Sequence, residues 1–184
     1  MARSDGVKRK RAFFDWHLVW TEKRRANRLA FILFWSILMA YFCKVYVVSV
    51  GIVHDISMQK TLPEGGYYLV NKYIYHFVPP ERGDIIVLRE DGHGSEEYVK
   101  RVIGLPGETL AIRFGHVYIN GRRLVEPYAV GPTYPDLGPY RIQKDTFFVL
   151  GDNRAVSQDS RFFGAVARRN IDGKVKPGEL FPFW

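Results

Sequence analysis

The sequence predicts a mainly antiparallel β domain preceded by one N-terminal transmembrane helix. Three observations lead to this fold class. A long apolar stretch follows a basic N-terminal tail, short segments rich in β-branched and aromatic residues fill the rest of the chain, and pairs containing Gly, Pro or Asn separate these segments. With 184 residues, the chain is long enough for a domain with its own hydrophobic core. We expect a basic tail over 1–28, a membrane anchor over 29–53 and a β domain over 54–184.

The net charge of +8 comes almost entirely from the tail. Residues 1–28 carry nine Lys or Arg and three Asp or Glu, whereas residues 54–184 carry 17 basic and 16 acidic side chains. A nucleic-acid-binding protein would be expected to show a basic face on its folded domain, so this distribution argues against nucleic acid as a partner. A cationic tail before an apolar stretch is instead typical of the cytoplasmic side of a membrane anchor.

The apolar stretch reads LAFILFWSILMAYFC over 29–43 and, after Lys44, VYVVSVGIV over 45–53. A helix over these residues would be about 37 Å long, enough to cross a hydrocarbon core of about 30 Å. A buried core helix fits the preceding cations poorly, and a cleaved secretory signal would end in small residues that the exit SVGIVHDIS lacks. We therefore expect an uncleaved single-pass anchor in the lipid bilayer of the plasma or inner membrane. The tail would be cytoplasmic and the β domain extracytoplasmic.

The expected β domain alternates between strand and turn signals. Asn120-Gly121 is a strong hairpin signal, and GPTYPDLGP over 131–139 is expected to be a loop. No run of 12 residues has a convincing helical period. We expect strands over Tyr67–Tyr75, Asp84–Leu88, Tyr98–Ile103, Thr109–Arg113, His116–Ile119 and Thr146–Leu150.

The cysteine and histidine content gives no sign of a disulfide or a metal centre. Cys43 is the single cysteine, so it cannot form an internal disulfide. The five histidines are scattered along the chain rather than grouped at metal-ligand spacing. We expect neither a zinc site nor a cofactor.

Ser57, just after the apolar stretch, is a candidate nucleophile. A serine hydroxyl is weak at neutral pH and needs a general base. Lys100 lies in the apolar context YVKRVIGL, where burial would lower its pKa and populate the neutral amine, whereas Arg101 cannot deprotonate. Most serines before strands are turn residues, however, and most strand lysines point to solvent. Residue types alone therefore leave both interpretations open.

Five segments with recognisable motifs follow one another along the chain. They are SMQKTL over 57–62, RGDIIV over 82–87, KRVIGLPGE over 100–108, VYINGRRLVEPY over 117–128 and GDNRAVSQDSR over 151–161. In this order they resemble segments of the type I signal peptidases, where the first, second, third and fifth read S-M-x-P-T-L, R-G-D-I-V-V, K-R-V-I-G-L-P-G-D and G-D-N-R-x-x-S-x-D-S-R. The likeness extends from Ser57 to Val175, and the single expected anchor also suits the family.

The resemblance implies a Ser–Lys serine endopeptidase that cleaves signal peptides from exported preproteins after small residues. Ser57 would attack the scissile carbonyl, and a neutral, buried Lys100 would take its proton. Ser157 would orient the lysine by a hydrogen bond, and Asp159 and Arg161 would form a structural pair nearby.

The resemblance also implies a first substrate pocket. Its lining would be Met58, Leu62, Tyr98 and Val99, for which ordinary core packing is the alternative interpretation. Asp152 and Arg154 have an equally plain interpretation as residues that hold a turn.

The chain departs from the family pattern at three places. Asp55 stands where family members often carry Ser or Gly, Lys60 replaces the proline of the nucleophile motif, and Gly65-Gly66 replaces a Gly-Asp pair. We expect Lys60 at most to loosen its loop. A carboxylate aimed at the developing oxyanion would repel it, so either Asp55 points away or activity is low.

Two other functions stay open. One is a Ser–Lys protease with a single dedicated client. The other is a catalytically degenerate relative that serves as a membrane scaffold or binding subunit, for which Asp55 is the only support.

Overall fold

The structure, a computed structural model, describes residues 16–42, 48–89 and 97–177. The chain divides into two compact units, Met1–Phe42 and Cys43–Trp184. In chain order the elements are α1 (Trp16–Phe42), β1 (Val48–Ile52), η2 (Ile56–Met58), β2 (Tyr67–Asn71), η3 (Ile74–His76), β3 (Ile85–Arg89), β4 (Glu97–Gly104), β5 (Thr109–Arg113), β6 (His116–Ile119), β7 (Arg122–Arg123), β8 (Leu137–Arg141), β9 (Thr146–Leu150), α2 (Ser160–Phe163), β10 (Val166–Ala167), η4 (Arg168–Asn170) and β11 (Ile171–Pro177).

The first unit contains the helix α1. From Leu29 to its end at Phe42 its large apolar side chains are exposed, between 43% at Leu38 and 68% at Ile37. Over the described part of the chain, no helix has both the length and the apolarity of a membrane span.

The expectation of one continuous helix over 29–53 is wrong at its C-terminal end. The helix ends at Phe42, and Val48–Ile52 form the strand β1, which pairs with β2. The β-branched residues of β1 favour a strand. The lack of a side chain at Gly51 leaves room for the Tyr68 ring, whose atoms lie 2.3 Å from where a Cβ would be. The β unit therefore begins before His54, and α1 begins within the expected tail. Residues 43–47 lie outside the described ones.

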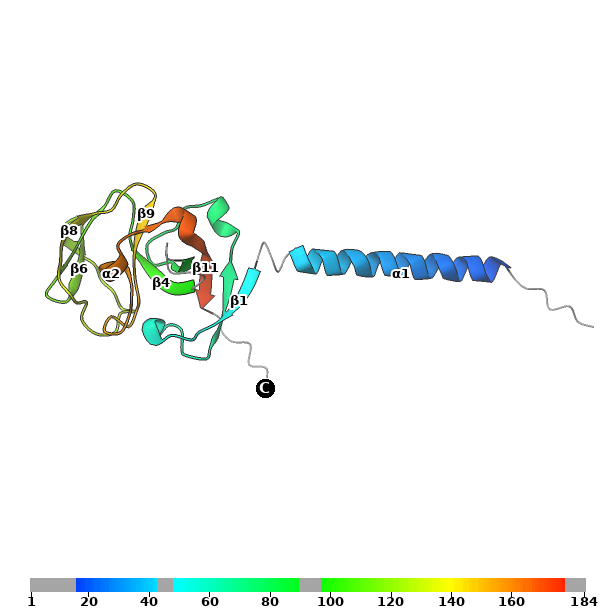
Figure 1. The fold of residues 1–184 in the computed structure, drawn as a ribbon, viewed down its shortest axis with the longest axis horizontal. Helices are drawn as coiled ribbons and strands as arrows, with labels where there is room; N and C mark the ends of the chain where they lie inside the picture. The colour runs from blue at the N-terminus through cyan, green and yellow to red at the C-terminus, as the bar shows by residue number, and fades with distance from the viewer. Residues whose placement is uncertain (1–15, 43–47, 90–96, 178–184) are drawn as a thin grey trace, which may run out of the picture. The chain divides into compact units, whose positions relative to one another are not determined.

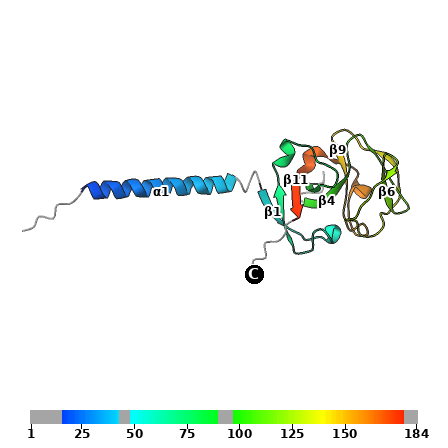
Figure 2. The same ribbon diagram turned by 180° about the vertical axis from the view of Figure 1, so that it is seen from behind.

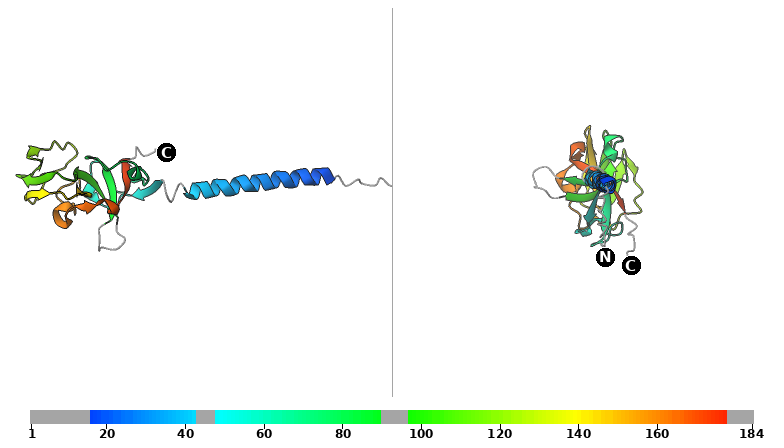
Figure 3. Two further views of the ribbon diagram at one scale, coloured as in Figure 1. Left: turned by 90° about the horizontal axis from the view of Figure 1, so that it is seen from above. Right: turned by 90° about the vertical axis from the view of Figure 1, so that its right-hand side faces the viewer.

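The second unit is mainly antiparallel β, as expected. A seven-stranded sheet has the order β1-β2-β11-β3-β4-β9-β10, and a four-stranded sheet has the order β7-β6-β5-β8. Every pair of neighbouring strands is antiparallel. Within this unit the strands β6 and β8 lie at one end and β1 at the other (Figures 1 and 2), and the view from above gives the same arrangement (Figure 3).

Most of the expected strands are present. Those over 109–113, 116–119 and 146–150 have the expected bounds, and β3 and β4 differ by a residue at their ends. The expected strand over Tyr67–Tyr75 is half wrong. It stops at Asn71, whose side-chain oxygen accepts the backbone N–H groups of Tyr73 and Ile74 and so turns the chain into η3.

The hairpin signal is confirmed, and the expected loop is partly wrong. Asn120 and Gly121 both have positive φ, 50° and 81°, as a tight hairpin turn requires, and Ile119 pairs with Arg122 across them. Residues 131–136 form a loop, but Leu137 already belongs to β8, which pairs with β5.

The core explains why β3 and β4 are rigid enough to carry a site. Along β3 the side chains alternate between two clusters, with Ile85 and Val87 in one and Ile86 and Leu88 in the other. Both faces of the strand are thus buried, which accounts for its continuous apolar sequence. The neighbouring strand β4 pairs with it in the register Ile86 to Lys100.

Candidate functional site

Ser57 lies in the short 3-10 helix η2, directly after the turn that leaves β1. It is 2% exposed, and its carbonyl oxygen accepts the backbone N–H of Asn153 at 2.8 Å. Asp55 caps this helix with extended backbone geometry, and its side chain accepts the Ser57 N–H. The local sequence therefore fixes the serine in a defined turn that is attached to the loop after β9.

Lys100 meets Ser57 from the neighbouring part of the sheet. It lies in the middle of β4, is 1% exposed, and its Nζ is 2.7 Å from Ser57 Oγ, although the two residues are 43 positions apart. Burial lowers the pKa of the Lys100 amine, while the charges of Asp55 and Asp159 act in the opposite direction. The lowered pKa populates a neutral amine that can accept the serine proton.

The Asp55 side chain points toward Ser57 and Lys100, and this direction is the one that the sequence left undetermined. Its Oδ1 accepts the Ser57 N–H at 3.1 Å and its Oδ2 lies 3.6 Å from Lys100 Nζ. Partial burial acts to raise the pKa of Asp55, but the hydrogen bond from Ser57 and the charge of Lys100 outweigh it and lower the pKa. Asp55 is therefore a carboxylate that contacts both the Ser57 backbone and the Lys100 amine.

The pair of Asp159 and Arg161 lies beside this cluster. Arg161 Nε is 2.8 Å from Asp159 Oδ1, and both side chains are at most 2% exposed. Asp159 also accepts the Gly151 N–H at 3.1 Å, and Arg161 donates to the Ser157 carbonyl at 3.2 Å. The pair thus connects the end of β9 with the segment that carries Ser157.

Ser157 is close to Ser57, but its hydroxyl makes no hydrogen bond. A Cβ on Gly151 would lie 2.2 Å from Ser157 Oγ and 2.8 Å from the Ser57 carbonyl oxygen, so both atoms surround one point. Ser157 is 4% exposed, and its Oγ has no hydrogen-bond partner. The expected hydrogen bond to Lys100 is therefore not formed in this structure, where the amine lies against Ser57 and Asp55 instead.

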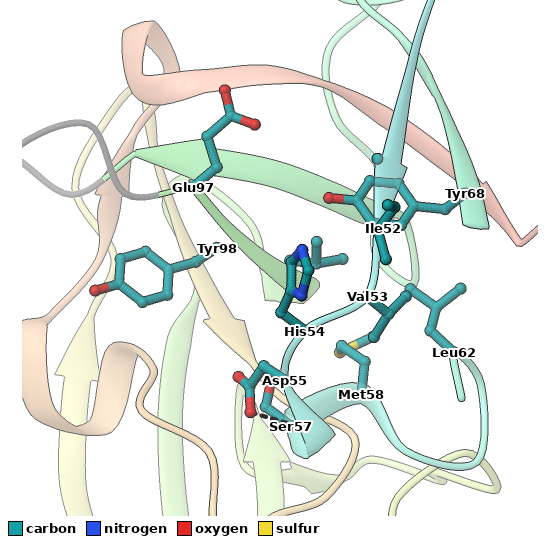
Figure 4. A pocket seen from close by; sticks show the side chains of 12 residues that line it. Ile52, Val53, His54, Asp55, Ser57, Met58, Leu62, Tyr68, Glu97 and Tyr98 are labelled. Carbon is teal, nitrogen blue, oxygen red and sulfur yellow. Dashed lines mark hydrogen bonds between the residues drawn. The ribbon is translucent and has the colours of Figure 1, made fainter. Parts of the chain in front are cut away.

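A cavity of about 520 Å³ opens at Ser57 (Figure 4). All four residues expected to line a substrate pocket contribute to its wall, and Figure 4 shows the Asp55 side chain directed at Ser57 on the same wall. The lining residues are Gly51, Ile52, Val53, His54, Asp55, Ser57, Met58, Leu62, Tyr68, Glu97, Tyr98 and Val99.

Two buried ion pairs that sequence reasoning did not assign hold the site to the rest of the unit. Arg101, set aside as a base, forms a two-pronged pair with Asp152 at 2.8 and 2.7 Å. Thr61 Oγ1 donates to the same carboxylate. The pair therefore fixes the end of the nucleophile loop, the segment over 57–62 that begins with the candidate nucleophile Ser57. Arg154 is held by Glu126 at 2.7 Å. The sequence marked Asp152 and Arg154 only as residues that hold a turn, and Arg101 only as a charge in the apolar context YVKRVIGL, so it did not reveal their partners.

His54, Tyr68 and Glu97 also line the cavity, although sequence reasoning did not select them. Their place depends on where the turn after β1 meets β2 and β4, which no local pattern reveals. Within the described residues, no group of three or more His, Cys, Asp or Glu side chains is arranged to hold a metal ion.

The family model and the related sequences that match this chain name the same family. A family model described as signal peptidase, peptidase S26, matches residues 26–178. The chain is 41% identical over 156 residues to a signal peptidase I of Leptolyngbya laminosa, covering 81% of this chain and 75% of that protein. It is 38% identical to a signal peptidase I of Bacillus caldolyticus, covering 77% of this chain and 82% of that protein. A crystal structure of a signal peptidase I from Enterococcus faecalis V583 matches with a TM-score of 0.46 and 34% identity, over 54% of this chain and 98% of that one.

Proposed function

The chain belongs to the type I signal peptidase family, peptidase S26, and is a serine endopeptidase; from this premise we propose that it cleaves signal peptides with Ser57 as nucleophile and Lys100 as general base. One observation carries the assignment of the two residues. A buried lysine amine lies 2.7 Å from the hydroxyl of a buried serine, at the edge of a cavity that opens to solvent. A lysine with no chemical task would rarely be buried in this way.

The proposed reaction has two stages. In the first, the Ser57 Oγ–H proton passes to the neutral Lys100 amine while Oγ bonds to the scissile carbonyl carbon, whose oxygen becomes an oxyanion. The C–N bond then breaks, and the Lys100 ammonium gives its proton to the leaving amine. In the second stage Lys100 takes a proton from water, the resulting hydroxide attacks the ester carbonyl, and Ser57 leaves and recovers its proton.

The wall of the cavity supports a preference for small uncharged side chains before the cut. Met58, Leu62 and Val99 supply apolar surface next to the nucleophile, and Met58 and Leu62 are at most 3% exposed, so their positions are fixed by packing. A rigid apolar wall beside the scissile bond would favour small apolar groups and reject large or charged ones.

Membrane attachment is part of the proposal. The apolar residues 29–43 follow the cationic tail, and the large side chains described from Leu29 to Phe42 are exposed rather than packed on protein. Such a surface is stable in contact with lipid. We assign residues 1–28 to the cytoplasm and the β unit to the extracytoplasmic side.

The test is cleavage of a preprotein by the purified full chain, followed by sequencing of the new N-terminus. The wild type should cut after a small residue at the end of the signal peptide. Ser57→Ala and Lys100→Ala should each lower kcat by at least about a thousandfold, and the double variant should be no worse, since the two groups act together. Lys100→Arg should fail as well because a guanidinium does not deprotonate. Lys176→Ala, which removes an exposed strand lysine, is the matched control and should retain the wild-type rate.

The contact of Asp55 with the Ser57 N–H favours one rival, a degenerate relative that binds signal peptides without cutting them. The same assay separates the two functions. A wild type that binds the preprotein but leaves it intact at every pH from 6 to 10 would contradict the proposed protease.

A further inference from the structure

The side chain of Asp55 occupies the position that the reaction needs for another negative oxygen. Acyl transfer by Ser57 develops an oxyanion beside Ser57, and backbone N–H groups, here that of Ser57 itself, are the usual donors to such an oxygen. In the structure that N–H is donated to Asp55 Oδ1 at 3.1 Å. Two anionic oxygens cannot share one donor without strong repulsion, because their charges would lie a few ångströms apart in a partly buried site. The carboxylate must therefore leave before the oxyanion forms.

The second carboxylate oxygen of Asp55 forms an ion pair with the Lys100 amine. Its Oδ2 lies 3.6 Å from Lys100 Nζ, so the carboxylate stabilises the protonated amine and opposes the neutral one that catalysis needs. One side chain thus restrains both the oxyanion donor and the general base in the unliganded protein.

The two partners of this ion pair differ greatly in exposure. The Asp55 side chain is 62% exposed, whereas that of Lys100 is 1% exposed. A rotation of the Asp55 side chain into water costs little because its carboxylate is already largely hydrated. The Lys100 side chain cannot rotate in the same way because protein surrounds it. Asp55 is therefore the group that moves when a substrate carbonyl arrives.

The buried Ser157 hydroxyl gives independent support. Its Oγ is left without a partner beside Ser57, although buried hydroxyls are nearly always hydrogen-bonded. The structure thus leaves the Ser157 hydroxyl unpaired, while Asp55 makes the contacts with the Ser57 N–H and the Lys100 amine.

We propose that Asp55 is a carboxylate latch, which in the unliganded protein occupies the Ser57 N–H and holds Lys100, and which a ligand carbonyl at Ser57 displaces. This inference rests on the proposed function for its meaning in turnover. Its contacts can nevertheless be tested without any cleavage.

The charges around the latch determine how it responds to pH. Lys100 is the cation that faces Asp55, and Asp159 and Arg161 act on Lys100 from the segment that follows Ser157. His54 and Glu97 line the same cavity from the turn after β1 and from β4. Removing the Asp55 charge should lower the pKa of Lys100, because the remaining groups are unchanged and one neighbouring anion is lost.

The first experiment titrates Lys100 by NMR in the full chain in detergent, with the lysine side chains isotopically labelled and Lys100→Arg used for assignment. Asp55→Asn keeps an oxygen that can cap Ser57 N–H and so keeps the fold. It should lower the pKa of Lys100 by about one unit, which is a tenfold change in the fraction of neutral amine below that pKa. Glu64→Gln, an exposed acid in the next turn, is the matched control and should leave the titration unchanged.

The second experiment measures a peptide aldehyde whose carbonyl takes up Ser57 Oγ to form a hemiacetal, with its oxygen at the oxyanion position. Asp55→Ser should bind the aldehyde about tenfold more tightly than wild type, because a hydroxyl replaces a competing anion. The corresponding peptide alcohol, which forms no such bond, should bind both proteins equally.

Cleavage of a preprotein completes the test. In Asp55→Asn the acid limb of kcat/KM should move to lower pH with the Lys100 titration, and in Asp55→Ser kcat should rise about tenfold. An unmoved Lys100 titration together with unchanged aldehyde affinity would overturn the latch even if the protein cleaves preproteins. If the Lys100 titration and the aldehyde affinity both change as expected while no variant cleaves, the latch stands and the proposed protease fails.

Discussion

The burial of the Lys100 amine carries an energetic cost that depends on pH. At 1% exposure the protonated form is poorly solvated, and burial lowers the pKa below its ordinary value of 10.5. Between the folded and unfolded pKa values the unfolded chain binds one more proton, so stability rises with pH across that window. The buried amine therefore destabilises the fold most strongly under acidic conditions.

Lys100→Met should make the protein more stable and inactive. The thioether fills a similar volume without a charge to desolvate, and the exposed Asp55 loses its partner at small cost. We expect a gain of about 1 kcal/mol or more in the free energy of unfolding near pH 7, measured by urea denaturation. The gain should grow as pH falls and shrink as pH approaches 10.5. A gain independent of pH would show that the amine is not the cause.

Lys60 has a backbone conformation that the family proline cannot adopt. Its φ is 93°, whereas a proline ring fixes φ near −65°. Lys60→Pro should therefore destabilise the nucleophile loop by about 2 kcal/mol or more and lower kcat, while Lys60→Gly, free at positive φ, should be neutral or stabilising. The measurements are thermal unfolding and preprotein cleavage.

The control for this loop is Lys60→Ala, which removes only the exposed contact of the amine with the Pro127 carbonyl at 3.0 Å. It should cost less than about 1 kcal/mol. If Lys60→Pro were as stable as Lys60→Ala, the positive φ would not describe the loop in solution.

Among single residues, the family resemblance selected side chains that line the cavity beside Ser57. These are Met58, Leu62, Tyr98 and Val99. Motif spacing could not reveal the direction of the Asp55 side chain, because a cap on a 3-10 turn depends on the φ and ψ of the turn itself. It could not reveal the unpartnered Ser157 Oγ either, since the amine of Lys100 chooses among several neighbours only in three dimensions.

Among the elements, the end of β9 matters most for the site. Gly151 follows this strand, and a Cβ there would lie 2.2 Å from Ser157 Oγ and 2.8 Å from the Ser57 carbonyl oxygen. The second of these is backbone and cannot swing away. The end of β9 can therefore approach the backbone of Ser57 only because Gly151 has no side chain.

Gly151→Ala should push the nucleophile turn away from β9. We expect a loss of at least about 2 kcal/mol in stability and a large fall in kcat with a smaller change in KM, because the position of Ser57 is altered more than the cavity wall. Gly138→Ala in β8 is the matched control, since its Cβ would meet nothing within 4 Å. Equal stability of the two variants would contradict the close approach.

Strand prediction succeeded where local signals were strong and failed where a strand depends on a distant partner. The hairpin turn at Asn120-Gly121 is encoded by its own two residues. The strand β1 was assigned to the anchor because its apolar sequence continues that of the helix, and only its pairing with β2 distinguishes it. The same holds for β11, which lies between β2 and β3 and has few strand signals of its own.

For the whole chain, the sequence predicted a basic tail over 1–28, an apolar anchor over 29–53 and a nearly neutral β domain over 54–184, whereas the compact units of the structure are Met1–Phe42 and Cys43–Trp184. The boundary could not be read from hydropathy, because an apolar run is equally compatible with a helix and with a buried strand. The exposed apolar surface of α1 remains the feature of the whole chain that most needs a partner.

Membrane attachment through that surface makes a prediction for the intact protein. In the double variant Ile32→Asp, Leu38→Asp, two exposed apolar side chains of α1 become carboxylates, which the hydrocarbon interior excludes. Alkaline extraction should then release the variant from membranes that retain the wild type, while kcat for a short soluble peptide stays unchanged because neither residue belongs to the cavity. Phe114→Asp, at an 82% exposed apolar position of the β unit, is the matched control and should stay with the membrane. Protease added to spheroplasts should digest the β unit and spare the tail; protection of the β unit would reverse the proposed orientation and separate the active site from exported substrates.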